Sequence, residues 1–413
     1  MNEYNFNAHI TEKLFNRFGG SERKETVVLD DGNEYLLKLP DPVRELGRDL
    51  SYINNAFSEF LGCRIMKLLG IPVQDVILGE YTAKSSTGEE RTYIACACKN
   101  LETDGYRLSE AELTSLSSAD DTKGAQTPSF ETIGEIAKYT PGISEQEIRK
   151  FYAEMFVADA FIGNTDRHNG NWGFLSKIGN ERKLAPVYDC GSCLCPLVAD
   201  ELLSDRLADN EAMNGMSVIK DRNGSKISYR QYLYSCENED VNRALAVIVP
   251  RIEMGEILKL IEATPYISDA RKRFYSRFLI TKYQRVLVPA LEKLHERNLS
   301  FAERTISGDE LYASYKKTVR SLRDIPVFAK REIRICGRQL NAIRADEGSV
   351  ILADPVTKKS EAVISPRSNN AEAWRSLQIL SQTFGVPVQK LVVDAERADG
   401  QLKGKDKPGK MAR

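Results

Sequence analysis

Residues 161 to 174, FIGNTDRHNGNWGF, place a carboxylate, an imidazole and an amide within a few positions of one another. Asp166 stands two residues before His168 and five before Asn171, in a chain that has only three His. A second carboxylate, Asp189, follows in the stretch KLAPVYDCGS. Carboxylate and amide oxygens are the hard donors that Mg²⁺ binds together with water and phosphate oxygens. These residues therefore predict magnesium-dependent phosphoryl transfer, in which an Asp orients the attacking hydroxyl group.

The stretch between Asn171 and Asp189 predicts a β-hairpin, because WGFLS and KLAPVYD flank the turn segment KIGNER. An antiparallel hairpin brings its first and last residues side by side. Asn171 and Asp189 are therefore expected to be neighbours, with Asp166 in the loop just upstream. Protein kinases use the same order of an Asp, four residues, an Asn and a later metal-binding Asp. His168 could hydrogen-bond the transferred phosphoryl group or accept the proton in place of Asp166.

The N-terminal half offers residues suited to a nucleotide. Lys38 lies in YLLKLP, on the second strand of a hairpin predicted over residues 25–40. Glu59 lies in the next segment, residues 51–70, whose apolar positions recur at helical spacing. The stretch FGGSERK (18–24) contains a turn whose backbone N–H groups could approach phosphates closely, formed by Gly19, Gly20 and Ser21. Kinases have the same order of features, in which a Gly turn, a Lys on a strand and a Glu on a helix precede the Asp-His-Asn motif.

These patterns together predict an α+β protein with a bilobal, protein-kinase-like fold. The helix predicted over residues 144–163 begins with the capping-box pair Ser144 and Glu147 and ends at Gly163, directly before the motif. The predicted parts are a β-rich N-lobe (1–98), a mostly helical C-lobe (99–325), a small appended α+β module (326–394) and a disordered basic tail (395–413).

Each of these features taken singly has a simpler explanation. The D-x-x-x-x-N spacing arises by chance in chains of this length, and a Gly-Gly pair is commonly just a turn. A Lys on a strand and a Glu on a helix commonly face solvent, and a lone His commonly has a structural role. The consistent order of all these features along one chain is what favours a phosphotransferase.

Composition limits the other classes of function. The net charge of −1 gives no overall field that would draw the chain to nucleic acid or to an anionic membrane. The N-terminus, MNEYNFNAHITEKLF, lacks the pattern of a secretory signal. No apolar run approaches the roughly 18 residues of a membrane span. We therefore expect a cytoplasmic protein.

The eight Cys are expected to be reduced thiols, given the chain length and the lack of a signal. The cluster CGSCLC could form half of a metal site through Cys190, Cys193 and Cys195. It lacks a second CxxC, so buried and chemically idle thiols are the favoured interpretation.

The motifs resemble those of HipA-like (CtkA-type) serine/threonine kinases, the toxin-type kinases of bacteria. The shared pieces are FGGSERK, YLLKLP, IGNTDRHNGNWGF and LAPVYDCGS, and the resemblance extends over about residues 14–300. It implies transfer of the γ-phosphoryl group of ATP to a Ser or Thr hydroxyl of a protein. Asp166 would then be the catalytic base, and Asn171 and Asp189 would bind Mg²⁺.

The resemblance also assigns an ATP site. The Gly turn and Lys38 would hold the phosphates, and backbone near residues 98–100 would hold adenine. The residues assigned to ATP are Gly19, Gly20, Ser21, Lys24, Lys38, Glu59, Cys98, Asn100 and Tyr188. The segment ACACKN lacks an acidic residue expected at the adenine site, and NRF lacks the Ser that HipA kinases autophosphorylate, which leaves Ser21 as the loop hydroxyl.

Two other functions stay open at this point. The string NTDRHNGNW also resembles the catalytic loop of type II phosphatidylinositol 4-kinases, which phosphorylate lipids, and CGSCLC could be compared with their palmitoylated loop. A nucleotide-binding pseudokinase is the non-enzyme alternative. For the favoured protein kinase, the expected partners are ATP, a protein substrate and an antitoxin-like regulator, with neither membrane nor direct nucleic-acid binding.

Overall fold

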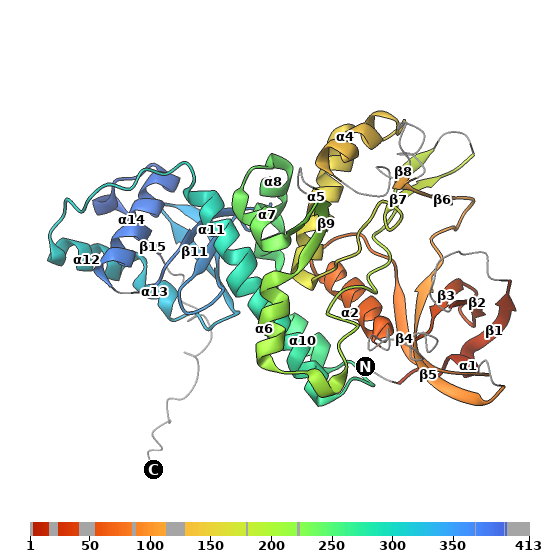
Figure 1. Ribbon diagram of the computed structural model, residues 1–413. Coiled ribbons are helices and arrows are strands. Elements are labelled where there is room, and N and C mark those ends of the chain that lie inside the picture. The colour runs from red at the N-terminus through yellow and green to blue at the C-terminus, as the bar shows by residue number, and fades with distance from the viewer. Residues whose placement is uncertain are drawn as a thin grey trace, which may run out of the picture. The chain divides into compact units, whose positions relative to one another are not determined.

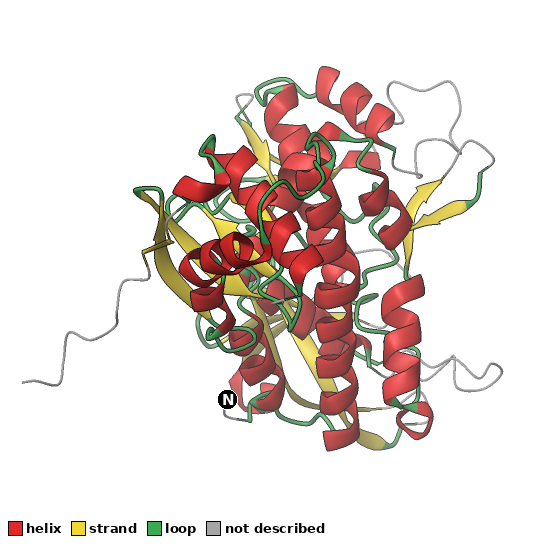
Figure 2. Cartoon of the chain, turned by 90° about the vertical axis from the view of Figure 1, so that its left-hand side faces the viewer, coloured by secondary structure: helices red, strands yellow, loops and turns green. Residues whose placement is uncertain are grey.

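The computed structural model describes residues 3–15, 24–40, 54–84, 88–112, 129–178, 181–220, 224–367, 369–391 and 393–394. The chain divides into two compact units. Unit 1 comprises Met1–Asn298 with Lys358–Ser360, and unit 2 comprises Leu299–Thr357 with Glu361–Arg413. Helices (red in Figure 2) are more abundant than strands (yellow).

An antiparallel sheet of five strands forms the N-terminal half of unit 1, in the order β1-β2-β3-β5-β4. Its strands are β1 (Ile10–Leu14), β2 (Lys24–Leu29), β3 (Glu34–Lys38), β4 (Val76–Lys84) and β5 (Glu90–Lys99), and the short helix α1 (Phe6–His9) precedes them. The hairpin predicted over residues 25–40 is confirmed, with Gly32 at a φ of 74° in its turn. Its register places Lys24 opposite Lys38.

Helix α2 (Asn55–Leu68) lies against β4 and β5 (Figure 1). Most of its residues are buried, including Glu59 at its centre. Gly62 lets the helix approach the loop after Asp189 closely, because a Cβ there would stand 2.7 Å from Cys190 Cβ and 2.9 Å from Cys193 Sγ. The sheet and α2 therefore present Lys38 and Glu59 toward that loop.

The Asp-His-Asn motif follows helix α5 (Glu145–Ile162), which packs on α4 (Phe130–Lys138). The predicted caps of α5 are confirmed: Ser144 and Glu147 form a capping box, and Gly163 ends the helix at a φ of 70°. The predicted hairpin is also confirmed, as β7 (Gly173–Ser176) pairs with β8 (Arg182–Leu184). A further strand, β6 (Arg107–Glu110), pairs with the other edge of β7.

The rest of unit 1 is mostly helical (Figure 1). Its helices are η2 (Asp200–Leu202), α6 (Asp205–Asn214), α7 (Tyr229–Ser235), α8 (Glu239–Ile248), η3 (Val249–Arg251), α9 (Met254–Glu262), α10 (Asp269–Lys282), the π-helical turn η4 (Tyr283–Leu287) and α11 (Val288–Glu296). The strands β9 (Met216–Lys220) and β10 (Lys226–Ser228) pair with each other.

Unit 2 is a five-stranded sheet, in the order β14-β13-β12-β11-β15, with helices that share one hydrophobic core with it. Its strands are β11 (Lys330–Ile335), β12 (Arg338–Arg344), β13 (Val350–Ala353), β14 (Ser360–Ile364) and β15 (Val393–Asp394). Its helices are α12 (Gly308–Thr318), α13 (Arg320–Arg323), α14 (Asn370–Phe384) and η5 (Val388–Lys390). This compact unit includes α12 and α13, which precede residue 326; the four predicted domain ranges as such stay a prediction.

In the part of the chain that the structure describes, no helix combines the length and the apolar character needed to cross a membrane.

Candidate active site

Lys38 is paired with two carboxylates that come from different parts of unit 1. Its Nζ lies 2.8 Å from Glu59 Oε2 on α2 and 2.8 Å from Asp189 Oδ1 in the loop after β8. The Glu59 side chain is 0% exposed, whereas 39% of the Asp189 side chain is exposed. One carboxylate therefore fixes the ammonium from inside the protein, and the other stays accessible from solvent.

Asp189 is held as an anion in an uncommon backbone conformation. Burial by itself would raise the pKa of its carboxyl, but the Lys38 ammonium, helped by Arg167 and Lys24, outweighs burial and lowers the pKa below its usual value. Its φ is 57°, in the left-handed region that non-glycine residues rarely adopt. The next residue secures the turn, because Cys190 N donates to Glu59 Oε1 over 3.0 Å. Strained residues of this kind cluster at functional sites.

Hydrogen bonds within the Asp-His-Asn motif fix the positions of Asp166 and Asn171. Asn171 Nδ2 donates to Asp166 O over 2.7 Å, and Asp166 N donates to Asn164 Oδ1 over 3.2 Å. The Asp166 side chain is exposed, whereas Asn171 is buried. The hydrogen bond from Asn171 to Asp166 thus closes a small loop whose Asp166 side chain is exposed to solvent, and it engages the amide nitrogen of Asn171 rather than the amide oxygen that was predicted to bind the metal.

Arg167 connects this loop to the segment before Asp189, a role that the sequence analysis missed. Its guanidinium is buried against Asp159 of α5, with Nε 2.9 Å from Asp159 Oδ2. Nη1 donates to Asn171 O over 2.8 Å and also to Tyr188 O. One side chain therefore joins the backbone at both ends of the β7–β8 hairpin. Arg167 thereby ties the backbone of Asn171 to that of Tyr188, the residue before Asp189. That Asn171 and Asp189 share one metal ion stays a prediction.

His168 takes part in the turn of the same loop. Gly170 N donates to His168 Nδ1 over 3.0 Å, and Asn171 N donates to His168 O over 2.9 Å. In a neutral imidazole whose Nδ1 accepts a hydrogen bond, the proton resides on Nε2. His168 is then a donor at Nε2, which suits contact with a phosphoryl oxygen better than removal of a proton.

Tyr188 also contacts the catalytic loop. Its hydroxyl donates to Gly170 O over 3.2 Å. Burial, with Glu110 as the next cause, raises the pKa of Tyr188 well above its usual value, so the phenol stays a neutral donor. The structure therefore gives Tyr188 a supporting contact between the two segments, and its predicted contact with ATP stays a prediction.

The segment predicted to hold adenine lies at the end of β5. Cys98 is buried between Leu36 and Val76 of the neighbouring strands. The N–H groups of Lys99 and Asn100 donate to the carbonyl groups of Asp75 and Glu34, over 2.9 Å and 2.8 Å. An adenine ring at this segment would meet N–H groups that already have partners. Gly19, Gly20 and Ser21 lie outside the described residues.

Two acidic residues beside the catalytic loop were not predicted. Glu110 ends β6 opposite Gly173, and Glu112 N donates to Asn169 O over 2.9 Å. Burial, and next the Glu112 carboxylate, raise the pKa of Glu110, on which His168 and Asp189 also act. The sequence RLSEAEL carries the two Glu at alternate positions, and only the pairing of β6 with β7 brings them to the site.

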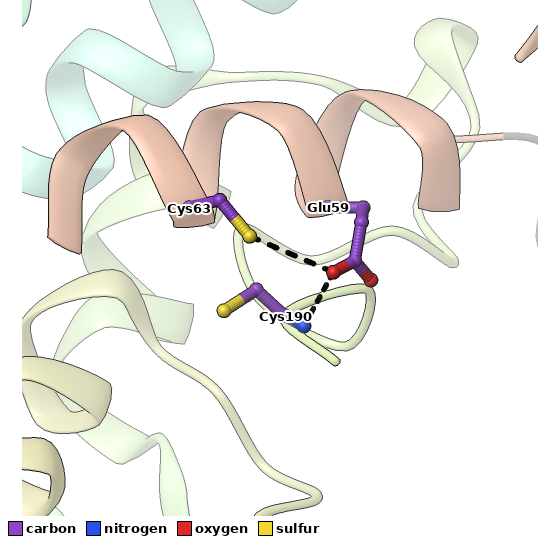
Figure 3. Close-up of side chains that lie close together, drawn as sticks. All are labelled: Glu59, Cys63 and Cys190. Carbon is purple, nitrogen blue, oxygen red and sulfur yellow. Dashed lines mark hydrogen bonds between the residues drawn. The ribbon is translucent and has the colours of Figure 1, made fainter. Parts of the chain in front are cut away.

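Buried thiols pack behind the Lys38–Glu59 pair. The ligand atoms of Glu59, Cys63 and Cys190 all lie within 4.8 Å of one another (Figure 3). Cys63 Sγ donates to Glu59 Oε1 over 3.6 Å. A hydrogen bond with Cys190, together with burial, raises the pKa of Cys63 well above its usual value. This favours the neutral thiol over the thiolate that metals bind. The thiols therefore pack as small apolar groups between α2 and the Asp189 loop.

The chain is similar in sequence and in fold to known bacterial proteins. The chain matches the family described as "HipA-like C-terminal domain" over residues 17–252. It is 32% identical over 289 residues to the serine/threonine-protein kinase CtkA of Helicobacter pylori, which covers 68% of this chain and 86% of that protein. The crystal structure of a Helicobacter pylori proinflammatory kinase CtkA matches with a TM-score of 0.61 and 29% identity, over 72% of this chain and all of that one.

Proposed function

The chain belongs to the HipA-like family, and from this premise we propose that it is an ATP- and Mg²⁺-dependent serine/threonine-protein kinase. The fold supports this proposal, because it is the mixed α+β fold of CtkA. The observation that carries the proposal is the position of the Lys38 ammonium between Glu59 and Asp189, 2.8 Å from each. A buried Glu that fixes a Lys next to an exposed, ionised Asp is the arrangement that protein kinases use around the nucleotide phosphates.

The residues around Asp189 fit Mg²⁺. Asp189 offers a partly exposed carboxylate whose pKa is held low by Lys38 against the effect of partial burial, so it is ionised at neutral pH. Asn171 offers an amide oxygen, since its nitrogen donates to Asp166 O. Mg²⁺ is commonly held by one or two such protein ligands together with substrate phosphates. When bound, it would neutralise charge on the β- and γ-phosphates.

The transfer itself would use Asp166. The hydroxyl oxygen of a substrate Ser or Thr forms a bond to the γ-phosphorus of ATP, while the bond from that phosphorus to the bridging oxygen breaks and ADP leaves. The hydroxyl proton passes to the Asp166 carboxylate, which is exposed and held in place through Asn171. His168, with its proton on Nε2, is the donor available for a phosphoryl oxygen.

Radiolabelled ATP tests the proposal. The purified chain is incubated with γ-labelled ATP and Mg²⁺, and casein and phosphatidylinositol vesicles are offered in parallel. Label in protein is the expected result. Label in lipid alone would establish the lipid kinase instead, and no label in either, with ATP still bound, would establish a pseudokinase.

Substitution of the predicted base makes the test specific. Asp166→Asn should lower turnover by roughly 10²–10⁴, the usual contribution of a general base. The matched control is Asp309→Asn, at an exposed Asp in the first turn of α12 in unit 2, and it should leave turnover unchanged. Turnover of Asp166→Asn within threefold of the wild type would remove Asp166 from this role. The cytoplasmic location and the antitoxin-like regulator stay predictions.

A further inference from the structure

Unit 2 contains a pocket of ≈ 280 Å³ whose wall includes three arginines. The arginines come from separate segments: Arg323 ends α13, Arg344 ends β12, and Arg367 follows β14. The other residues of the wall are Glu347, Pro366 and Asn369. The three-arginine pocket, as we call it, thus gathers three cations and one anion around a small volume.

Arg344 is the innermost of the three cations. Only 4% of its side chain is exposed. Its Nε donates to Asp346 O, and its Nη2 donates to Glu347 O over 3.0 Å and to Glu347 Oε2 over 3.3 Å. Its Nη1 is buried and finds no hydrogen-bond partner among the residues that the structure describes. A buried donor without a partner costs about 1–3 kcal/mol, and more for a charged group. Arg344 therefore contributes a nearly enclosed positive charge to the pocket wall, and an anion in the pocket would lower the cost of burying that charge.

The N-terminus of a long helix forms another part of the wall. Asn369 is the N-cap of α14, a helix of 15 residues, and its Oδ1 accepts from Glu372 N over 2.9 Å. The first N–H groups of a helix have no partner within it, and the helix dipole makes this end positive. Tyr315 fixes the neighbouring segment, because its hydroxyl donates to Pro366 O over 2.8 Å.

Arg323 and Arg367 are exposed, so the pocket can be reached from solvent. Two carboxylates oppose the cations. Glu347 is 83% exposed, and Glu372 Oε1 lies 3.5 Å from Arg367 Nη1. Glu372 Oε2 also accepts from Ser365 Oγ over 2.7 Å, which holds that carboxylate beside the segment that carries Pro366 and Arg367. Three arginines against these two carboxylates leave one positive charge in excess around the pocket.

We propose that the three-arginine pocket binds a phosphate monoester. Three guanidinium groups from three segments and a helix N-terminus surround the volume from several sides, which suits a tetrahedral dianion with three free oxygens. A planar carboxylate would engage one or two of these groups. Arg clusters and helix N-termini are the standard means of binding phosphate groups in proteins. The proposal concerns unit 2 and does not depend on the proposed kinase activity.

Calorimetric titration of the full-length chain tests the proposal and separates the sources of the phosphate. The probes are inorganic phosphate, an Ala/Gly-based peptide with one phosphoserine, and the same peptide unphosphorylated. The variants are Arg323→Gln and Arg367→Gln, which change exposed side chains and should leave the melting temperature unchanged. The matched control is Arg338→Gln, at the other end of β12, where Arg338 pairs with Glu361 outside the pocket.

We expect the phosphorylated probe to bind and the unphosphorylated peptide not to bind. Arg323→Gln and Arg367→Gln should each weaken binding about tenfold, because each removes a charge-assisted hydrogen bond, and Arg338→Gln should keep the wild-type affinity. Tighter binding of the phosphopeptide than of inorganic phosphate would identify a phosphorylated polypeptide as the source, and equal affinities would identify a small phosphate; both support the proposal. Equal binding of the unphosphorylated peptide, binding unaffected by both Arg variants, or no binding of either phosphate probe at millimolar concentration would overturn it.

Discussion

Replacing Lys38 with Met should lower the free energy of unfolding of unit 1, in addition to abolishing the proposed phosphotransfer. Glu59 is 0% exposed, and Lys38 is the cation that pairs with it, at 2.8 Å. In Lys38→Met, Glu59 keeps its hydrogen bonds from Cys190 N and Cys63 Sγ but loses that cation. Removal of one partner from a buried ion pair costs about 3–5 kcal/mol. Asp189 is 39% exposed, and solvent screening makes its share of the loss small.

This cost is a large part of the free energy of unfolding of a folded protein, which is usually about 5–15 kcal/mol. The double variant Lys38→Met/Glu59→Gln should recover most of it, because Gln carries no charge and its amide oxygen can still accept from Cys190 N. Both variants should lack phosphotransfer, since both lack the Lys38 ammonium. Comparison of the two variants would thereby separate the effect of Lys38 on stability from its effect on activity.

Urea unfolding followed by tryptophan fluorescence measures the effect in unit 1 alone. The chain has two Trp, and Trp172 is buried in the catalytic motif while Trp374 lies in unit 2. In a Trp374→Phe background, Trp172 is the single reporter. A free energy of unfolding for Lys38→Met within about 1 kcal/mol of the wild type, or no recovery in the double variant, would refute the reasoning from the buried carboxylate.

Three further predictions follow from the site and its surroundings. Asp189→Asn removes the charge of Asp189 but keeps its backbone conformation, because Asn tolerates a positive φ. The pKa of Asp189 is lowered in the folded state, so the ionised carboxylate stabilises the fold at neutral pH. In urea titrations, the difference in the free energy of unfolding between the variant and the wild type should therefore shrink below about pH 4. Gly62→Ala should lower both the melting temperature and turnover, because the new Cβ would lie 2.7 Å from Cys190 Cβ. The control Gly255→Ala, with open space around its Cβ, should raise the melting temperature slightly. Equal effects of the two substitutions would contradict the close packing of α2. Lys282→Met should stabilise the protein at pH 7, because burial lowers the pKa of Lys282 to about 8. Between about pH 8 and 10.5 the unfolded chain binds more protons than the folded chain, so the stability gained by the variant should fade as the pH rises across that interval. Thermal melts measure this gain, and a difference in melting temperature that stays constant with pH would contradict the prediction.

Short-range features were accessible from the sequence because neighbouring residues determine them. The capping box of Ser144 and Glu147, the hairpin turn at Gly32 and the hairpin between Asn171 and Asp189 each depend on a few adjacent residues, and all are present. The hydrogen bond from Asn171 to Asp166 likewise follows from their five-residue spacing within one loop. The approach of Lys38 to Glu59 could be expected from the kinase-like order of the elements, in which a Lys on a strand precedes a Glu on a helix.

Only the tertiary structure decided which distant groups share one environment. Arg167 and Asp159 form a buried pair that joins α5 to both ends of the hairpin, although no local sequence pattern marks either residue as buried. Glu110 reaches the catalytic loop through the pairing of β6 with β7, and the three arginines of unit 2 meet although 44 residues separate the first from the last. Local hydrogen bonds set turns and caps, but the burial and pairing of a charge depend on which surfaces pack against each other. Which surfaces pack against each other depends on the whole core, so it cannot be deduced from any short segment of the sequence.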